Sequence, residues 1–119
     1  MPISHILGLS RLAKPLTSEE GRRILERDHY RCQYCGLDGM SNFENSLIMT
    51  VDFVQPRAKK GKKKPDNLVT ACRPCNVIKG HRTFDTFEGA KAYILKRRME
   101  LQKEWESKTA ELRSESAAV

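Results

Sequence analysis

Four cysteines in two Cys-x-x-Cys pairs constrain this chain more than any other feature. The pairs are Cys32/Cys35 and Cys72/Cys75. Two thiols at this spacing can face one metal ion, and tetrahedral zinc takes four thiolates arranged as two such pairs. Disulfides, a redox-active pair and buried thiols without a metal are the alternatives. We predict a shared structural zinc, because no βαβ pattern accompanies either pair and the N-terminus shows no pattern typical of secretion.

The length of the chain makes such a metal useful for folding. The chain has 119 residues, 39% of them hydrophobic, and a single Trp. A chain of this size forms one small domain, and its apolar core is thin without a cross-link. We therefore expect the zinc to contribute directly to the stability of the fold.

Positive charge is concentrated in residues 57–82. The net charge of the chain is +7, and this segment holds nine basic residues and one acid, Asp66. Such a segment attracts polyanions, with an affinity that falls as salt rises. A solvated, disordered loop is the alternative, and for residues 59–64 both descriptions can hold. No apolar run reaches the roughly 18 residues that span a bilayer, so we expect a soluble, cytoplasmic protein without a membrane partner.

The first half of the chain contains one clear helix signal and one strand signal. Residues 1–16 are expected to form a loosely docked arm. Thr17 and Glu20 form a capping box at the start of a short helix that leads into the first cysteine pair. Residues 36–45 have the composition of a loop, and residues 47–54 have the β-branched and aromatic content of a strand.

The second half predicts a strand and two helices. Residues 68–71 are expected to pair with the first strand as a hairpin. A short helix follows Cys72 and ends at Gly80. Residues 86–111 form a long amphipathic helix with an apolar stripe, which contains Phe87, Ala90, Ile94, Leu101 and Trp105. This helix is expected to pack on the domain in a monomer, or alternatively to pair with a second subunit in a homodimer.

Strand, basic loop, strand and helix, with a cysteine pair at each end, form the arrangement of the ββα-metal fold. Three motifs in order, VDFVQP, DNLV and CRPCNVIKG, resemble the signature of the HNH endonuclease family in its cysteine-framed branch. The resemblance covers roughly residues 30–83. It implies a small zinc-stapled α+β domain at residues 17–83, after the arm and before a C-terminal helix at residues 84–119 that packs on the domain and frays at its end.

The resemblance also implies a hydrolytic site. In the family, one divalent ion, Mg²⁺ or Mn²⁺, binds the phosphate and the leaving oxygen, and a histidine takes a proton from water. Asp52 and Asn76 match the metal ligands, and both offer the oxygen atoms that such ions prefer. Asn67 matches the asparagine that holds the catalytic loop. Taken singly, each of these three residues also suits a structural role in a turn, an ion pair or a polar helix face.

Four basic side chains are the candidates for contacts with the DNA backbone: Lys62, Lys63, Lys79 and Arg82. Such contacts hold phosphates without reading the base sequence. His81 follows Asn76 by five residues and is included among the candidate catalytic residues, although a contact with phosphate or solvent is the alternative.

Phe53 stands where the family has its catalytic histidine. Phenylalanine has no atom that accepts a proton, and general-base catalysis is worth typically about 10²–10⁴ in rate. His81 or a metal-bound hydroxide would be the substitutes, whereas Gln55 could only position water. We expect an HNH-type endonuclease that hydrolyses DNA slowly or not at all. The alternative is a zinc-stapled nucleic-acid-binding module without catalysis.

Overall fold

The centre of the molecule is a two-stranded antiparallel sheet. The computed structural model describes residues 16–55 and 61–117. Within them, β1 (Met49–Phe53) pairs with β2 (Leu68–Cys72). The predicted hairpin is therefore confirmed, although β1 begins two residues later than expected. The expected arm, apart from its last residue, lies outside the described residues, as do Arg57, Lys59 and Lys60 of the basic segment.

A capped helix precedes the sheet and docks on it. The helix α2 (Ser18–Arg27) begins with the predicted capping box, in which Thr17 Oγ1 accepts a hydrogen bond from the Glu20 amide and Glu20 accepts one from the Thr17 amide. At its other end, Asp28 Oδ2 accepts a hydrogen bond from the Thr70 amide at 2.8 Å. Because Thr70 belongs to β2, this contact fixes α2 against the hairpin.

A short helix replaces part of the predicted loop and strand. The helix α3 (Phe43–Leu47) starts after Asn42, whose side chain accepts a hydrogen bond from the Asn45 amide. The prediction of a loop through residue 45 and a strand from residue 47 was wrong at this point. The physical reason is the asparagine cap, which satisfies a backbone donor at the start of a helix and so favours a helical turn.

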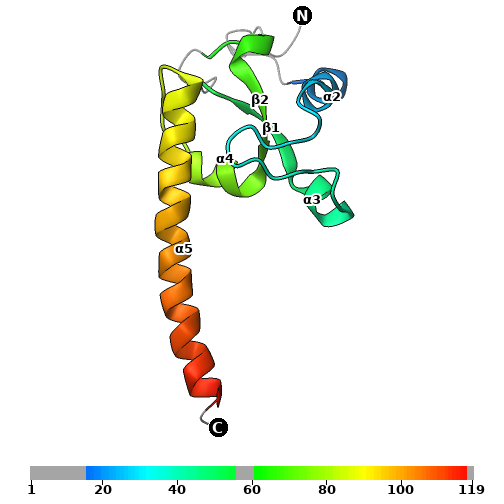
Figure 1. The fold of residues 1–119 in the computed structure, drawn as a ribbon. Coiled ribbons are helices and arrows are strands. Elements are labelled where there is room, and N and C mark those ends of the chain that lie inside the picture. Colours follow the sequence, from blue (N-terminus) through cyan, green and yellow to red (C-terminus); the bar gives the residue numbers. More distant parts are fainter. Residues whose placement is uncertain (1–15, 56–60, 118–119) are drawn as a thin grey trace, which may run out of the picture.

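The second cysteine pair lies at the junction of β2 and α4 (Arg73–Lys79). Pro74 occupies the first turn of α4, and the Arg73 amide donates to the Ile48 carbonyl at 2.7 Å. Gly80 ends the helix with a backbone φ of 59°. Residues that have a Cβ atom rarely adopt a positive φ, whereas glycine does so readily. The predicted short helix is confirmed. Figure 1 shows α2 and α3 on one side of the hairpin and α4 beside it.

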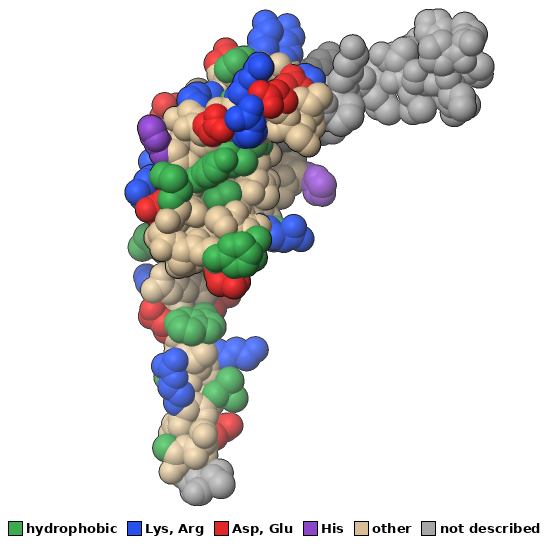
Figure 2. All heavy atoms as spheres, turned by 90° about the vertical axis from the view of Figure 1, so that its right-hand side faces the viewer, with side chains coloured by type: hydrophobic (Ala, Val, Ile, Leu, Met, Phe, Trp, Pro, Cys, Tyr) green, Lys and Arg blue, Asp and Glu red, His purple; other side chains and the backbone are tan. Residues whose placement is uncertain are grey.

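The long helix α5 (Phe87–Ala117) packs on the domain only with its first part. Ala90 and Ile94 are fully buried, whereas Trp105 is 57% exposed and Leu112 is 53% exposed. In Figure 1 the yellow end of α5 lies along the domain and the red end extends away from it. Figure 2 shows hydrophobic side chains exposed along this extended part. The predicted apolar stripe is therefore buried near Ile94 and exposed beyond Leu101.

The core is small, as expected from the length of the chain. Its buried members are contributed by the cysteine pairs, the hairpin and α5: Cys32, Tyr34, Val54, Ala71, Cys72, Cys75, Ala90 and Ile94. The Tyr34 ring stacks on Phe87 with 5.3 Å between the ring centroids. None of the helices in the described part of the chain is both long and apolar enough to cross a membrane.

Candidate metal centre and nucleic-acid interface

The four cysteines converge on one point. Their sulfur atoms all lie within 4.8 Å of one another, and Cys35 Sγ lies 3.7 Å from Cys72 Sγ. All four are free thiols. Zinc–sulfur bonds of about 2.3 Å in a tetrahedron place the sulfurs about 3.8 Å apart. The cluster thus has the composition and the spacing of a structural zinc site, and it argues against the disulfide alternative.

The surroundings of the cluster suit four thiolates bound to a cation. Hydrogen bonds from Cys72 and Cys75 lower the pKa of Cys32, whereas the contact with Cys32 raises the pKa of Cys72 to about 11 and also raises that of Cys75, so ionisation of one thiol opposes ionisation of its neighbours. Arg98 of α5 donates through Nη1 to Cys75 Sγ at 3.6 Å. Burial lowers the pKa of Arg98, but the charges of the cysteine sulfurs raise it by more. A zinc ion and Arg98 together would compensate the negative charge of the sulfurs.

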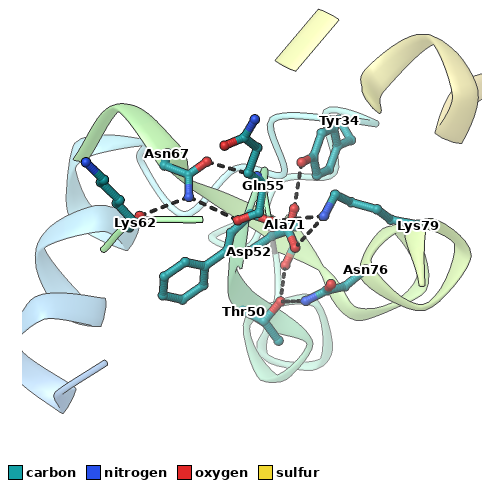
Figure 3. Close-up of polar contacts among 10 residues, drawn as sticks. Tyr34, Thr50, Asp52, Gln55, Lys62, Asn67, Ala71, Asn76 and Lys79 are labelled. Carbon is teal, nitrogen blue, oxygen red and sulfur yellow. Dashed lines mark hydrogen bonds and ion pairs between the residues drawn. The ribbon is translucent and has the colours of Figure 1, made fainter. Parts of the chain in front are cut away.

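Asp52 lies at the centre of a buried polar cluster between β1 and α4 (Figure 3). It is 6% exposed; the Tyr34 hydroxyl donates to its Oδ2 at 2.6 Å, and Lys79 Nζ lies 3.4 Å from its Oδ1. Burial raises the pKa of Asp52 above its usual value, and the Tyr34 hydrogen bond and the Lys79 charge offset this rise only in part. Both carboxylate oxygens therefore have a partner within the protein, and one of these partners is a cation.

Asn76 lies beside this cluster without a hydrogen bond to Asp52. Its Nδ2 donates to Thr50 Oγ1 at 3.2 Å, and the Thr50 hydroxyl donates to the Ala71 carbonyl at 2.8 Å. Figure 3 shows Thr50 and Asp52 of β1 on the side of α4 that carries Asn76 and Lys79. The two predicted metal ligands are thus on neighbouring elements, but each is engaged by the protein.

The arrangement around Asp52 does not fit a divalent ion. Mg²⁺ requires a near-octahedral shell of oxygen ligands at about 2.0–2.1 Å and usually keeps several waters. Asp52 is almost closed to solvent, and its carboxylate already has an ammonium group and a hydroxyl as partners. While Tyr34 and Lys79 hold its two oxygens, the Asp52 carboxylate offers no free oxygen ligand to such an ion.

Two positions bear on the activation of water: Phe53, which stands where the family has its histidine, and His81. Side chains alternate along a strand, so Phe53 points to the face opposite Asp52. Val51 shares that face, which α2 covers, and Phe53 is half-buried. His81 is exposed after the end of α4 and has no hydrogen bond or ion pair with any residue that the structure describes. In the described part of the chain, no contact holds His81 toward Asp52.

Asn67 forms a clamp between β1 and the basic segment. Its Oδ1 accepts a hydrogen bond from the Gln55 amide at 2.9 Å, and its Nδ2 donates to the carbonyls of Gln55 and Lys62. Figure 3 shows the side chain bridging the two segments. This geometry agrees with the loop-holding role that the resemblance implies, and it is more than the simple cap of a turn.

The candidate phosphate-binding residues divide into exposed and buried ones. Lys62 is exposed and lines a cleft of about 370 Å³, together with Lys64 and the clamp residue Asn67. Arg82 is exposed above the Tyr93 ring, 4.7 Å from its centroid. These positions leave their charged groups near the surface, where a polyanion can approach.

Lys63 and Lys79 differ from this pattern. Lys63 Nζ lies 3.0 Å from Glu20 Oε1, so part of its charge is balanced by α2. The expectation that Lys79 contacts phosphate is contradicted by its burial, because it is 1% exposed and bonds to Asp52 and to the Phe53 carbonyl. The reason is its position on the inner face of α4, three residues after Asn76.

Comparison with protein families identifies residues 32–82 with the family described as HNH endonuclease. This part of the chain belongs to the HNH endonuclease family. The matched segment begins at the first cysteine of the cluster and contains the hairpin, the basic segment and α4. No curated protein and no solved structure matches the chain. Members of the HNH family are generally hydrolases, act on nucleic acids and use a divalent metal.

Within this HNH domain, the structure adds three residues that sequence reasoning missed. Tyr34 lies inside the first cysteine pair and reaches Asp52, Thr50 engages Asn76, and Arg98 contacts Cys75. Only Arg98 had a detectable signal, because it follows the buried Ile94 by four residues on one helix face. Tyr34 and Thr50 depend on contacts between distant segments, which no local pattern indicates.

Proposed function

We propose that this HNH domain binds DNA through phosphate contacts and lacks the fast hydrolysis typical of its family. The observation that carries this proposal is the state of Asp52, which is buried and paired with Lys79 and Tyr34. The zinc site holds the fold, and the surface around the basic segment binds the nucleic acid. Phe53, in the position of the catalytic histidine, agrees with the loss of hydrolysis.

Exposed basic side chains support the DNA-binding part of the proposal. Lys62, Lys64, Arg73 and Arg82 are all exposed among the described residues. The clamp at Asn67 holds the backbone that carries Lys62, which limits the conformational entropy that the lysine segment loses on binding. Contacts of this kind recognise the charge of the backbone and carry no sequence information directly.

The binding test is a titration of a fluorescent DNA duplex at two salt concentrations, without divalent ions. About three phosphate contacts give a logarithmic salt slope of about −3, which is a loss of roughly 50-fold between 50 and 200 mM salt. Lys62→Ala/Lys64→Ala is expected to weaken binding and to reduce the slope. The matched control is Lys103→Ala/Lys108→Ala on the extended part of α5, which removes two exposed lysines away from the hairpin. If both double variants lost DNA affinity equally, the result would argue against the surface around Lys62 and Lys64 as the DNA-binding surface.

Slow hydrolysis is the second candidate function, and the intact clamp at Asn67 favours it, because the resemblance to the family implies that this asparagine holds the catalytic loop. Plasmid and linear DNA are incubated with Mg²⁺ or Mn²⁺ and with the parent, Asn76→Ala or Phe53→His. We expect no nicking by the parent. Nicking by the parent that disappears in Asn76→Ala would instead support an enzyme, and cleavage only in Phe53→His would show that the missing base limits the reaction.

A further inference from the structure

Lys79 is the most deeply buried charged residue for which the structure shows a single carboxylate partner. Its side chain is 1% exposed, its Nζ donates to the Phe53 carbonyl at 2.9 Å, and it lies 3.4 Å from Asp52 Oδ1. Lysine is rarely buried to this degree unless it is paired. The pair therefore belongs to the folded structure and differs from the exposed ion pairs on α2 and α5.

The Lys79 ammonium group neutralises the charge of the Asp52 carboxylate. Asp52 is the carboxylate that corresponds to a metal ligand in the HNH family, and Lys79 places one positive charge beside it on the side of α4. Tyr34 satisfies the other carboxylate oxygen from the first cysteine pair. A buried carboxylate needs a counter-charge and hydrogen bonds, and this chain supplies both without an ion.

We propose that the Lys79 ammonium is an internal cation that takes the place of the divalent ion at Asp52, so that the HNH centre of this chain is a masked metal site. Binding of Mg²⁺ or Mn²⁺ at Asp52 requires that Lys79 leave its buried partner. The inference deepens the proposed function and rests on it, because a DNA-binding domain without hydrolysis has no use for the metal.

Removal of the ammonium unmasks the site. In Lys79→Met the side chain keeps a similar length and apolar stem but loses its charge. Asp52 is then a buried carboxylate without a counter-charge, close to the amide side chain of Asn76 (Figure 3). A divalent cation that enters restores the charge balance, and the Asn76 side chain, whose Nδ2 donates to Thr50 Oγ1, can turn its amide oxygen toward that cation.

The test measures metal binding by the zinc-loaded full chain without DNA. Binding of Mn²⁺ is followed by the loss of the free-ion signal in electron paramagnetic resonance, and Mg²⁺ is tested by competition. We expect Lys79→Met to bind one Mn²⁺ at least about tenfold more tightly than the parent. The double variant Lys79→Met/Asp52→Asn is the matched control, and it is expected to lose this gain. Lys103→Met controls for the removal of a lysine elsewhere.

Two results would overturn the inference. One is a parent that binds Mn²⁺ as tightly as Lys79→Met and loses this binding in Asp52→Asn. The other is a folded Lys79→Met that gains no affinity for Mn²⁺.

The test also covers a Lys79→Met variant that does not fold without metal. Folding of this variant on addition of Mn²⁺ supports the inference. Failure to fold with Mn²⁺, while the double variant Lys79→Met/Asp52→Asn does fold, contradicts it. DNA affinity is measured separately without divalent ions, so failure here is distinguishable from failure of the proposed DNA binding.

Discussion

The Arg98 guanidinium on α5 lies 3.6 Å from the sulfur of Cys75 and so joins the long helix to the cysteine cluster. Four thiolates around one Zn²⁺ leave an excess of negative charge, and a donor beside one sulfur reduces it. The contact also explains why α5 belongs to the structure of the domain: it supplies a buried face at Ala90 and Ile94 and a charge at Arg98.

Arg98→Gln is expected to weaken zinc binding. Mutation of a residue that hydrogen-bonds to a metal ligand typically lowers the metal affinity by about 10–100-fold. The measurement is the rate of zinc release to a chromogenic chelator. Arg97→Gln is the control, because the ion pairs of Arg97 within the described residues are with exposed glutamates on α5, Glu100 and Glu104. Equal zinc release from both variants would show that the contact with Cys75 does not support the site.

Removal of the zinc is expected to unfold the domain. The core is small and the cluster contributes three of its fully buried side chains, Cys32, Cys72 and Cys75, so metal binding and folding should be coupled. Circular dichroism during titration with a chelator should show loss of structure in step with the appearance of reactive thiols. Cys35→Ser should shift this transition to lower chelator concentration. A domain that keeps its fold and its thermal midpoint after zinc loss would contradict the prediction.

Tyr34→Phe is expected to destabilise the fold by about 1–3 kcal/mol. The substitution keeps the ring that stacks on Phe87 but removes the hydroxyl donor to a buried carboxylate, Asp52. Urea denaturation measures the change in the free energy of unfolding. Tyr93→Phe is the control, because the Tyr93 hydroxyl makes no hydrogen bond to the described part of the chain. If Tyr93→Phe lowered the free energy of unfolding by a similar amount, the effect of Tyr34→Phe could not be assigned to the hydrogen bond with Asp52.

Asp28 is expected to stabilise the fold in a pH-dependent way. Burial raises its pKa, but the hydrogen bonds from Arg27 and from the Thr70 amide outweigh burial and hold the pKa below 3.8. A lowered carboxylate pKa means that the stabilisation is fully present above about pH 4 and is lost as the pH falls through the lowered value. Asp28→Asn should cost about 1–2 kcal/mol at neutral pH.

The measurement is urea denaturation with excess zinc from pH 7 down to the lowest pH at which the cysteines still hold the metal, and the difference between the parent and Asp28→Asn should begin to shrink as the pH approaches 4. Asp66→Asn, at an exposed carboxylate, is the control. A difference that grows on acidification would have the wrong sign and would reject this account.

Deletion of residues 109–119 is expected to change the thermal midpoint by no more than about 2–3 °C. The removed part of α5 is almost entirely exposed, including Leu112 at 53%. Ile94→Ala is the contrasting variant, since Ile94 is fully buried and such a substitution costs about 2–5 kcal/mol. Large destabilisation by the deletion, with a midpoint that depends on protein concentration in the parent, would instead indicate a homodimer through this helix.

Several elements were predictable because their signals are local. The capping box at Thr17 and Glu20 starts α2, and Gly80 ends α4 with a positive φ. The spacing of the cysteines predicted their convergence, because two residues between thiols suffice to turn both toward one ion. The start of β1 was less predictable, because the cap at Asn42 extends a helical turn into the expected strand.

The sequence by itself determined the cysteine cluster, the hairpin with its flanking helices, and the absence of a histidine at position 53. Only the tertiary structure decided the state of Asp52, because its two partners come from two other segments: Tyr34 from the first cysteine pair and Lys79 from α4 meet it on β1. The same sequence motif is compatible with an Asp52 carboxylate that is free to bind a metal ion or with one that is buried in an ion pair. Burial decides between them, since it depends on how α4 and the first cysteine pair pack over the hairpin.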